Sequence, residues 1–124
     1  MDADPQRVLK LHALFENSLW QRALPWQPFF PGVEIHRLYE SGLEGPRAAL
    51  LRFHPGGRVP LHRHVGYEHI VVLEGEQVDE QGKAEKGALI INLPGTSHSV
   101  SSEHGCIVLA IYEKPVEFLH QNGA

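Results

Sequence analysis

Residues 56–75 read GGRVPLHRHVGYEHIVVLEG, a group of histidines and a glutamate between apolar runs and glycines. His62 and His64 are two residues apart, and on a β-strand residues i and i+2 project from the same face. Both imidazoles can therefore reach one ion at about 2.0–2.1 Å. The segment 65–67, VGY, predicts a turn, after which Glu68 starts the next strand with its carboxylate able to face the same space.

A fourth candidate ligand lies further along the chain. His98 follows the turn pair Pro94-Gly95, which would deliver it onto a strand beside the first three residues. Three imidazoles and one carboxylate suit several first-row metals, and the ligand set alone does not choose among them. We therefore predict one divalent transition metal ion per chain (Zn, Fe, Mn or Ni). Its predicted ligands are His62, His64, Glu68 and His98.

From residue 33 onward, short runs of β-branched and aromatic residues alternate with breaks that contain glycine or proline. Regular short strands with turn signals are typical of an all-β sandwich or barrel. The predicted strands are Val33–Glu40, Ala48–Phe53, His62–His64, Glu68–Leu73, Gln77–Asp79, Lys83–Glu85, Ala88–Leu93, His98–Ser101 and Cys106–Glu113.

Three of these runs, residues 70–73, 89–91 and 106–111, are apolar at successive positions. A strand with one solvent-facing side should alternate between apolar and polar residues, so something must cover the outer face of this sheet. We expect the N-terminal helix to cover part of it and a second copy of the chain to cover more, which predicts a homodimer. His69, one residue beyond Glu68, is expected on this outer face.

The ends of the chain follow a different pattern. Residues 4–20 predict a helix, because Asp4 can cap it, Pro5 suits its first position and apolar residues recur at helical spacing. Residues 25–32, PWQPFFPG, contain three prolines and predict an extended linker. The expected organisation is an N-terminal helix and linker over 1–32, a barrel over 33–113 and a tail over 114–124.

The composition excludes several classes of function. The 124 residues are 42% hydrophobic and fit one domain. A net charge of -4 without a basic block argues against binding nucleic acid or an anionic membrane. The single cysteine, Cys106, excludes an internal disulfide and a CxxC metal site. Without a long apolar stretch or a signal-peptide pattern, we expect a cytoplasmic protein whose partner is a small molecule.

The spacing of these residues resembles the cupin superfamily. The first cupin motif, approximately G-x5-H-x-H-x3/4-E-x6-G, is matched by Gly56, His62, His64, Glu68 and Gly75. The second, approximately G-x5-P-x-G-x2-H-x3-N, is matched by Gly87, Gly95 and His98, with Leu93 and Ser102 replacing the motif proline and asparagine. The resemblance covers about residues 33–113. It implies a double-stranded β-helix, a jelly-roll-like barrel with the ion inside its mouth.

A narrower resemblance, to the cupin domain of ChrR-type anti-sigma factors, rests on PGVEIHRLYE, ALLRFHPGGRVPLHRHVGYEHIVVLEGEQVDEQGK and PGTSHSVSSEHGC. In ChrR-type proteins a separate N-terminal domain with histidine and CxxC zinc ligands carries the regulatory activity. This sequence has no CxxC, so we do not expect sigma-factor binding. Stand-alone relatives of this cupin type include dioxygenases that cleave carbon–carbon bonds in diketones or hydroxyketones.

Two functions remain open at this point. We favour a metal-dependent, oxygenase-type enzyme acting on a small carbonyl compound, because a four-ligand site leaves positions for water, O2 or a substrate oxygen. The alternative is a non-catalytic cupin of the ChrR type that senses a metal or a ligand. An inert barrel that picks up metal is a third reading. No separate acid or base is assignable, and the candidate substrate contacts are Arg52, Tyr67, Ile70 and Val72.

Overall fold

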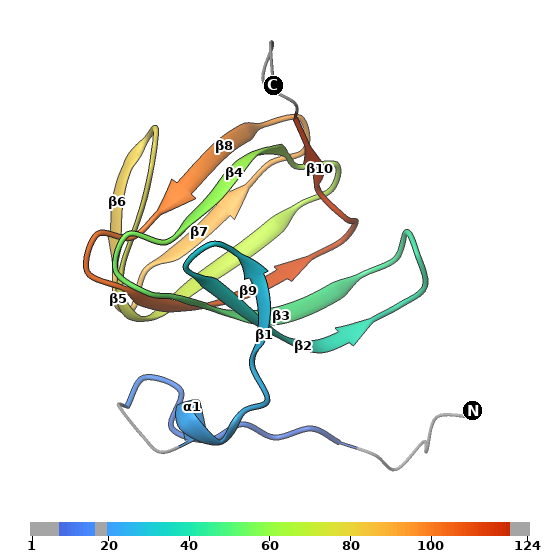
Figure 1. Ribbon diagram of the computed structural model, residues 1–124. Helices are drawn as coiled ribbons and strands as arrows, with labels where there is room; N and C mark the ends of the chain where they lie inside the picture. Colours follow the sequence, from blue (N-terminus) through green and yellow to red (C-terminus); the bar gives the residue numbers. More distant parts are fainter. Residues whose placement is uncertain (1–7, 17–19, 120–124) are drawn as a thin grey trace.

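The computed structural model describes residues 8–16 and 20–119, which form a strongly curled antiparallel sheet with one short helix (Figure 1). The elements are α1 (Trp20–Ala23), β1 (Gln27–Phe30), β2 (Val33–Glu40), β3 (Arg47–Phe53), β4 (Arg58–Arg63), β5 (Glu68–Asp79), β6 (Gly82–Glu85), β7 (Leu89–Asn92), β8 (Ser97–Ser101), β9 (Cys106–Tyr112) and β10 (Glu117–Phe118). The sheet follows the order β1-β2-β3-β9-β5-β8-β4-β10, and β6 and β7 also pair with β5. The predicted all-β class is confirmed. Among the described residues, no helix is long and apolar enough to cross a bilayer.

A β-bulge in β5 decides which of its side chains reach the interior. Val72 pairs with Val108 and Glu74 with Ile107, so Leu73 is an additional residue in β5. An additional residue shifts the two-residue alternation, and every later side chain changes face. The segments 68–73 and 77–79, predicted as two strands, are therefore one strand. Even-numbered residues face the interior before the bulge, and odd-numbered residues face it after the bulge.

Gly75, which follows this bulge, has a backbone conformation that requires glycine. Its φ is +72°, and a Cβ at this position would collide with the carbonyl oxygen of Gly105. This close approach joins the bend of β5 to the turn before β9, and it gives the last glycine of the first cupin motif a structural reason.

The prediction of a helix over residues 4–20 is wrong over residues 8–16, although a short N-terminal helix, α1, begins at Trp20. Residues 8–16 contain no helix, and Val8 and Leu9 are 70% and 61% exposed. A helical pattern of apolar residues stabilises a helix only when the whole apolar face packs against something, and here only Leu14 packs against the sheet while Leu11 and Phe15 stay exposed. Residues 1–7 and 17–19 lie outside the described residues.

The two flanking segments predicted without strands also contain β-structure. Residues 27–30 of the predicted linker are extended, as expected, and they pair with β2 as strand β1. In the predicted tail, β10 pairs with β4, so Glu117 lies opposite Arg63 and Phe118 opposite His62. The remaining tail residues, 120–124, lie outside the described part of the chain.

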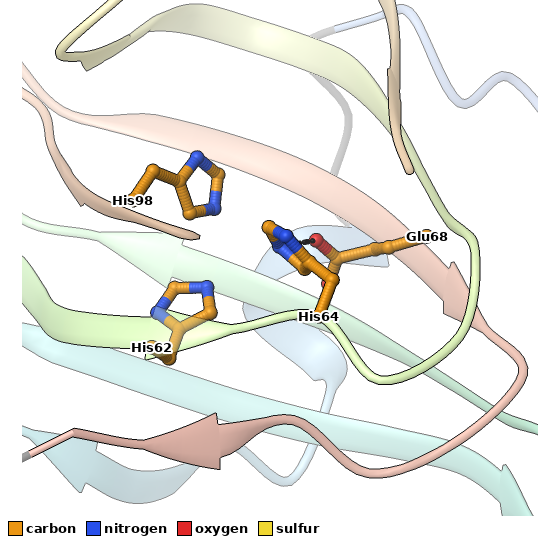
Figure 2. A group of neighbouring side chains, drawn as sticks. All are labelled: His62, His64, Glu68 and His98. Atoms are coloured by element: carbon orange, nitrogen blue, oxygen red, sulfur yellow. Dashed lines mark ion pairs between the residues drawn. The ribbon is translucent and has the colours of Figure 1, made fainter. Parts of the chain in front are cut away.

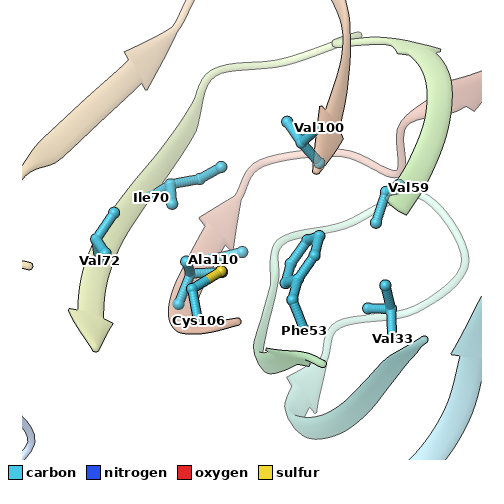
Figure 3. Packing of buried hydrophobic residues seen from close by; sticks show 9 residues of the cluster. Val33, Phe53, Val59, Ile70, Val72, Val100, Cys106 and Ala110 are labelled. Carbon is cyan, nitrogen blue, oxygen red and sulfur yellow. The ribbon is translucent and has the colours of Figure 1, made fainter. Parts of the chain in front are cut away.

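Apolar residues pack on both faces of the sheet. The inner cluster is Val33, Phe53, Val59, Ile70, Val72, Val100, Cys106, Val108 and Ala110 (Figure 3). On the outer face, Leu50, Leu73 and Ile107 are covered by residues that include Leu14, Leu24 and Trp26.

The N-terminal segment thus covers part of the outer face, as expected, although not as a helix. Leu89, Ile91 and Ile111 remain exposed on the outer face, where His69 pairs with both isoleucines. Coverage of these residues by a second copy of the chain stays a prediction.

Candidate metal centre

Four side chains from three strands and one turn converge in the interior (Figure 2). His62, in β4, lies directly opposite His98, in β8. Glu68 is the first residue of β5. His64 lies just after β4, where its backbone N–H donates to the carbonyl of Thr96 and its carbonyl accepts from Gly95.

The distances and the burial of this cluster suit a single metal ion. One candidate ligand atom from each residue lies within 4.8 Å of the candidate atoms of the other three. All four side chains are buried, with exposed fractions from 1% for His64 to 6% for Glu68. The four residues predicted as ligands therefore lie together, and their binding of a metal ion stays a prediction.

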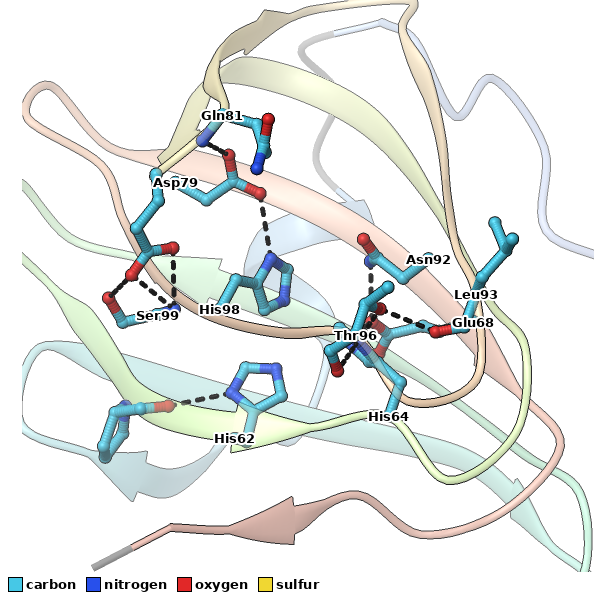
Figure 4. A network of polar contacts seen from close by, with 12 residues as sticks. His62, His64, Glu68, Asp79, Gln81, Asn92, Leu93, Thr96, His98 and Ser99 are labelled. Carbon is cyan, nitrogen blue, oxygen red and sulfur yellow. Dashed lines mark hydrogen bonds and ion pairs between the residues drawn. The ribbon is translucent and has the colours of Figure 1, made fainter. Parts of the chain in front are cut away.

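Hydrogen bonds fix which nitrogen of each histidine faces the centre (Figure 4). Nδ1 of His62 lies 2.8 Å from the carbonyl oxygen of Pro60, and Nδ1 of His64 lies 3.0 Å from that of Thr96. Nδ1 of His98 lies 2.9 Å from a carboxylate oxygen of Asp79. An N–H that donates at Nδ1 leaves Nε2 with its lone pair free, which is the form that binds a metal.

Two of these Nε2 atoms, those of His64 and His98, are buried without a hydrogen-bond partner. His64 Nε2 lies 3.0 Å from Glu68 Oε1 without forming a hydrogen bond. Two atoms at this separation could both lie at about 2.1 Å from one ion. Asn92 donates to the same glutamate oxygen at 3.1 Å and orients it. The donor set and its unpaired atoms therefore fit a divalent metal ion.

Electrostatics favour the neutral imidazole that such a site needs. Burial lowers the pKa of His62, and the neighbouring His98 adds to this effect. A neutral imidazole carries the lone pair that a metal ligand must supply.

A cavity of about 50 Å³ opens beside the cluster. At about 10–15 Å³ for each water position, it has room for roughly four water-sized groups. Its wall is mainly apolar, and its polar members are His62, Glu68, Gln77, His98 and Tyr112. Such a cavity suits a ligand of few atoms with few polar contacts.

The four residues proposed as substrate contacts lie in different places. Ile70 lines the cavity, whereas Val72 is fully buried in the inner cluster beyond it. Arg52 lies on the outer face of β3, where it donates to Glu34 at 2.7 and 2.9 Å and stacks on Trp26. Tyr67 is half exposed in the turn before β5. Neither Arg52 nor Tyr67 is among the residues that line the cavity.

Sequence reasoning missed the residues that surround the ligands. Asp79, Asn92 and Thr96 orient His98, Glu68 and His64, respectively. Gln77 and Tyr112 line the cavity. Strand alternation could have placed Tyr112, because it shares the parity of Ala110 in β9, but Gln77 and Asp79 depend on the bulge at Leu73.

The curled antiparallel sheet, with the buried His₃Glu cluster at its interior, has the cupin fold. The family model described as "ChrR Cupin-like domain" matches residues 18–117, and the chain belongs to this family. A comparison with curated proteins finds no match.

Solved structures give the same fold. A complex of Rhodobacter sphaeroides SigE with the anti-sigma ChrR matches with 30% identity and a TM-score of 0.66, over 73% of this chain and 50% of that chain. An acetylacetone dioxygenase from Acinetobacter johnsonii matches with 15% identity and a TM-score of 0.76, over 100% and 85%. An RmlC-like cupin from Ralstonia eutropha matches with 21% identity and a TM-score of 0.72, over 82% and 70%. This chain thus spans half of the ChrR-complex chain that it matches.

Proposed function

We propose that the chain binds one divalent metal ion and is an oxygenase-type enzyme that acts on a small carbonyl compound. The observation that carries this proposal is the geometry of the site: a His₃Glu cluster with unpaired Nε2 atoms, open to a small apolar cavity. A bound metal would supply Lewis acidity and, as Fe(II), electrons for reaction with O2.

The residues of the chain would bind, orient and desolvate the reactants. His62, His64, Glu68 and His98 would hold the ion, and the apolar wall would exclude water. Burial, with the nearby Glu68 carboxylate, raises the pKa of Tyr112. A tyrosine is protonated at neutral pH even at its ordinary pKa, and Tyr112, which lines the cavity, can donate a hydrogen bond there.

A dicarbonyl compound is the substrate class that this site would suit best, because two neighbouring oxygens can chelate one ion. Cleavage of one carbon–carbon bond with insertion of both atoms of O2 yields two carbonyl products, and this reaction needs no external reductant. The fold likeness to an acetylacetone dioxygenase supports this choice of substrate.

The test is oxygen uptake by protein loaded anaerobically with Fe(II), using acetylacetone, related diketones and hydroxyketones. We expect one O2 consumed per substrate molecule by at least one compound. Protein loaded with Zn(II), and a His62→Ala/His64→Ala variant treated with Fe(II), should consume none. A protein that holds one iron per chain but consumes no O2 with any compound would contradict the enzymatic proposal.

The second candidate is a non-catalytic metal or ligand sensor, favoured by membership of the ChrR cupin-like family and by 30% identity to the ChrR complex. It predicts tight zinc binding and a partner whose binding is lost with a chelator. A pull-down from the native host, with and without chelator, separates it from the enzyme. Either activity would be cytoplasmic, since the single buried thiol of Cys106 suits a reducing compartment.

A further inference from the structure

Gln77 is a polar side chain buried where the fold does not need one. It lies in β5 with 3% of its surface exposed, and its side-chain nitrogen Nε2 has no hydrogen-bond partner among the described residues. Buried polar groups in proteins are almost always paired, so an unpaired one needs a specific reason.

The bulge at Leu73 turns Gln77 toward the interior. Asp79, two residues further along the same face, reaches His98 Nδ1 at 2.9 Å. Gln77 itself lines the cavity together with His62, Glu68 and His98. Its amide therefore shares one small space with the open side of the candidate metal centre.

The adjacent residue Glu76 is a buried polar group of this strand that is paired, whereas Oε2 of Glu74, on the outer face, is buried without a partner. The Glu76 carboxylate accepts from the Ser102 hydroxyl at 3.2 Å and from the His104 backbone N–H at 3.0 Å. Gln77 faces the opposite side, where most of the cavity wall is apolar. A methionine or leucine would fill this position without burying an unpaired amide, so packing alone does not explain glutamine here.

We propose that Gln77 donates a hydrogen bond from its side-chain amide to an oxygen atom of the ligand that fills this cavity. The inference rests on the proposed function and narrows its substrate class. The ligand is a small carbonyl or carboxylate compound with at least two oxygens toward the His₃Glu cluster, one of which also accepts the hydrogen bond from Gln77. The amide acts by binding and orienting this ligand.

The experiment compares the wild-type protein, Gln77→Met and Gln81→Met, all loaded with Co(II) and titrated with acetylacetone as the probe. Methionine keeps the length of the side chain and removes the donor. Gln81 is an exposed glutamine in the same region and serves as the matched control. Co(II) absorption reports both metal binding and the approach of the probe to the ion.

We expect Gln77→Met to bind Co(II) as wild type does and to bind acetylacetone at least about tenfold more weakly, which corresponds to about 1.4 kcal/mol. Its thermal midpoint should be equal to that of wild type or higher, because the unpaired amide is gone. Gln81→Met should match wild type in every measurement.

Each other outcome is decisive. Equal probe affinity in wild type and Gln77→Met overturns the role of Gln77 and leaves the proposed function intact. Loss of Co(II) or of folding in Gln77→Met, and also in Gln77→Leu, would show a structural role and overturn the inference. A wild-type protein that binds Co(II) but not the probe would contradict both the inference and the proposed substrate class.

Discussion

The interior of the sheet contains two regions that are built in opposite ways. In the first, the packed region, Val33, Phe53, Val72, Cys106 and Val108 are almost fully buried against one another. In the second, the site region, side-chain nitrogens of His64, His98 and Gln77 are buried without a hydrogen-bond partner, and His98 and Gln77 line a cavity. The packed region stabilises the fold, whereas the site region contains polar groups that no described residue satisfies. The comparison teaches that substitutions in the two regions should separate stability from binding.

The largest effect is expected in the packed region, at Phe53, whose side chain is 2% exposed. Phe53→Ala should lower the free energy of unfolding by about 3–5 kcal/mol, because it removes apolar burial and leaves a cavity. The folded fraction should still bind one metal ion per chain. Urea unfolding and elemental analysis measure the two quantities, and loss of metal from folded Phe53→Ala would break the separation of the two regions.

In the site region, we expect His62→Ala/His64→Ala to lose the stabilisation that a bound metal provides. A metal at 100 to 1,000 times its Kd stabilises the folded state by about 2.7–4.1 kcal/mol, and this variant should gain none of it. Urea unfolding with and without the metal measures the difference.

His69→Ala is the matched control for this variant, because His69 is exposed although it follows Glu68 directly. This variant should keep both the metal and its stabilisation. A His62→Ala/His64→Ala variant that still holds one ion per chain would disprove the assignment of these histidines as metal ligands.

A smaller effect is expected at Asp79, which contacts the site only through Nδ1 of His98. The negative charge of Asp79 orients the imidazole of His98 and makes that imidazole more basic. Asp79→Asn removes this charge. Loss of such a partner weakens metal binding about 10- to 100-fold. Competition with a chelator of known affinity measures the change.

Glu80→Gln provides the comparison for Asp79→Asn. Glu80 is the next residue, and its carboxylate accepts from Ser99 and not from a histidine. Its replacement should leave the metal affinity unchanged. Equal affinities for Asp79→Asn and wild type would mean that His98 does not depend on this contact.

The two regions also differ in how far the sequence predicts them. The candidate ligands follow from local spacing, since His62, His64 and Glu68 lie within seven residues and a turn delivers His98. Strand alternation likewise predicts much of the inner cluster. By contrast, Gln77 and Asp79 face the site only because Leu73 is an additional residue in β5, and no simple periodicity encodes that bulge.

The segments at the two ends were harder to predict for another reason. The apolar pattern of residues 8–15 suited a helix, but helical spacing says nothing about whether a partner surface is present. Strand β10 consists of two residues, Glu117 and Phe118, and it is defined by pairing with β4 rather than by its own composition.

The smallest expected effect in the packed region is a loss of folding stability at alkaline pH, and it arises from Cys106. Burial raises the pKa of its thiol from 9.0 to about 12, so the unfolded chain releases this proton at lower pH than the folded chain does. The stability contributed by the neutral thiol is complete below about pH 9 and is lost as the pH rises toward 12. Between pH 8 and pH 10 the loss is about 1 kcal/mol. Urea unfolding should therefore show that Cys106→Ala is less destabilising at pH 10 than at pH 8 by this amount. Wild type and variant with the same pH dependence would mean that the thiol is not shielded from water.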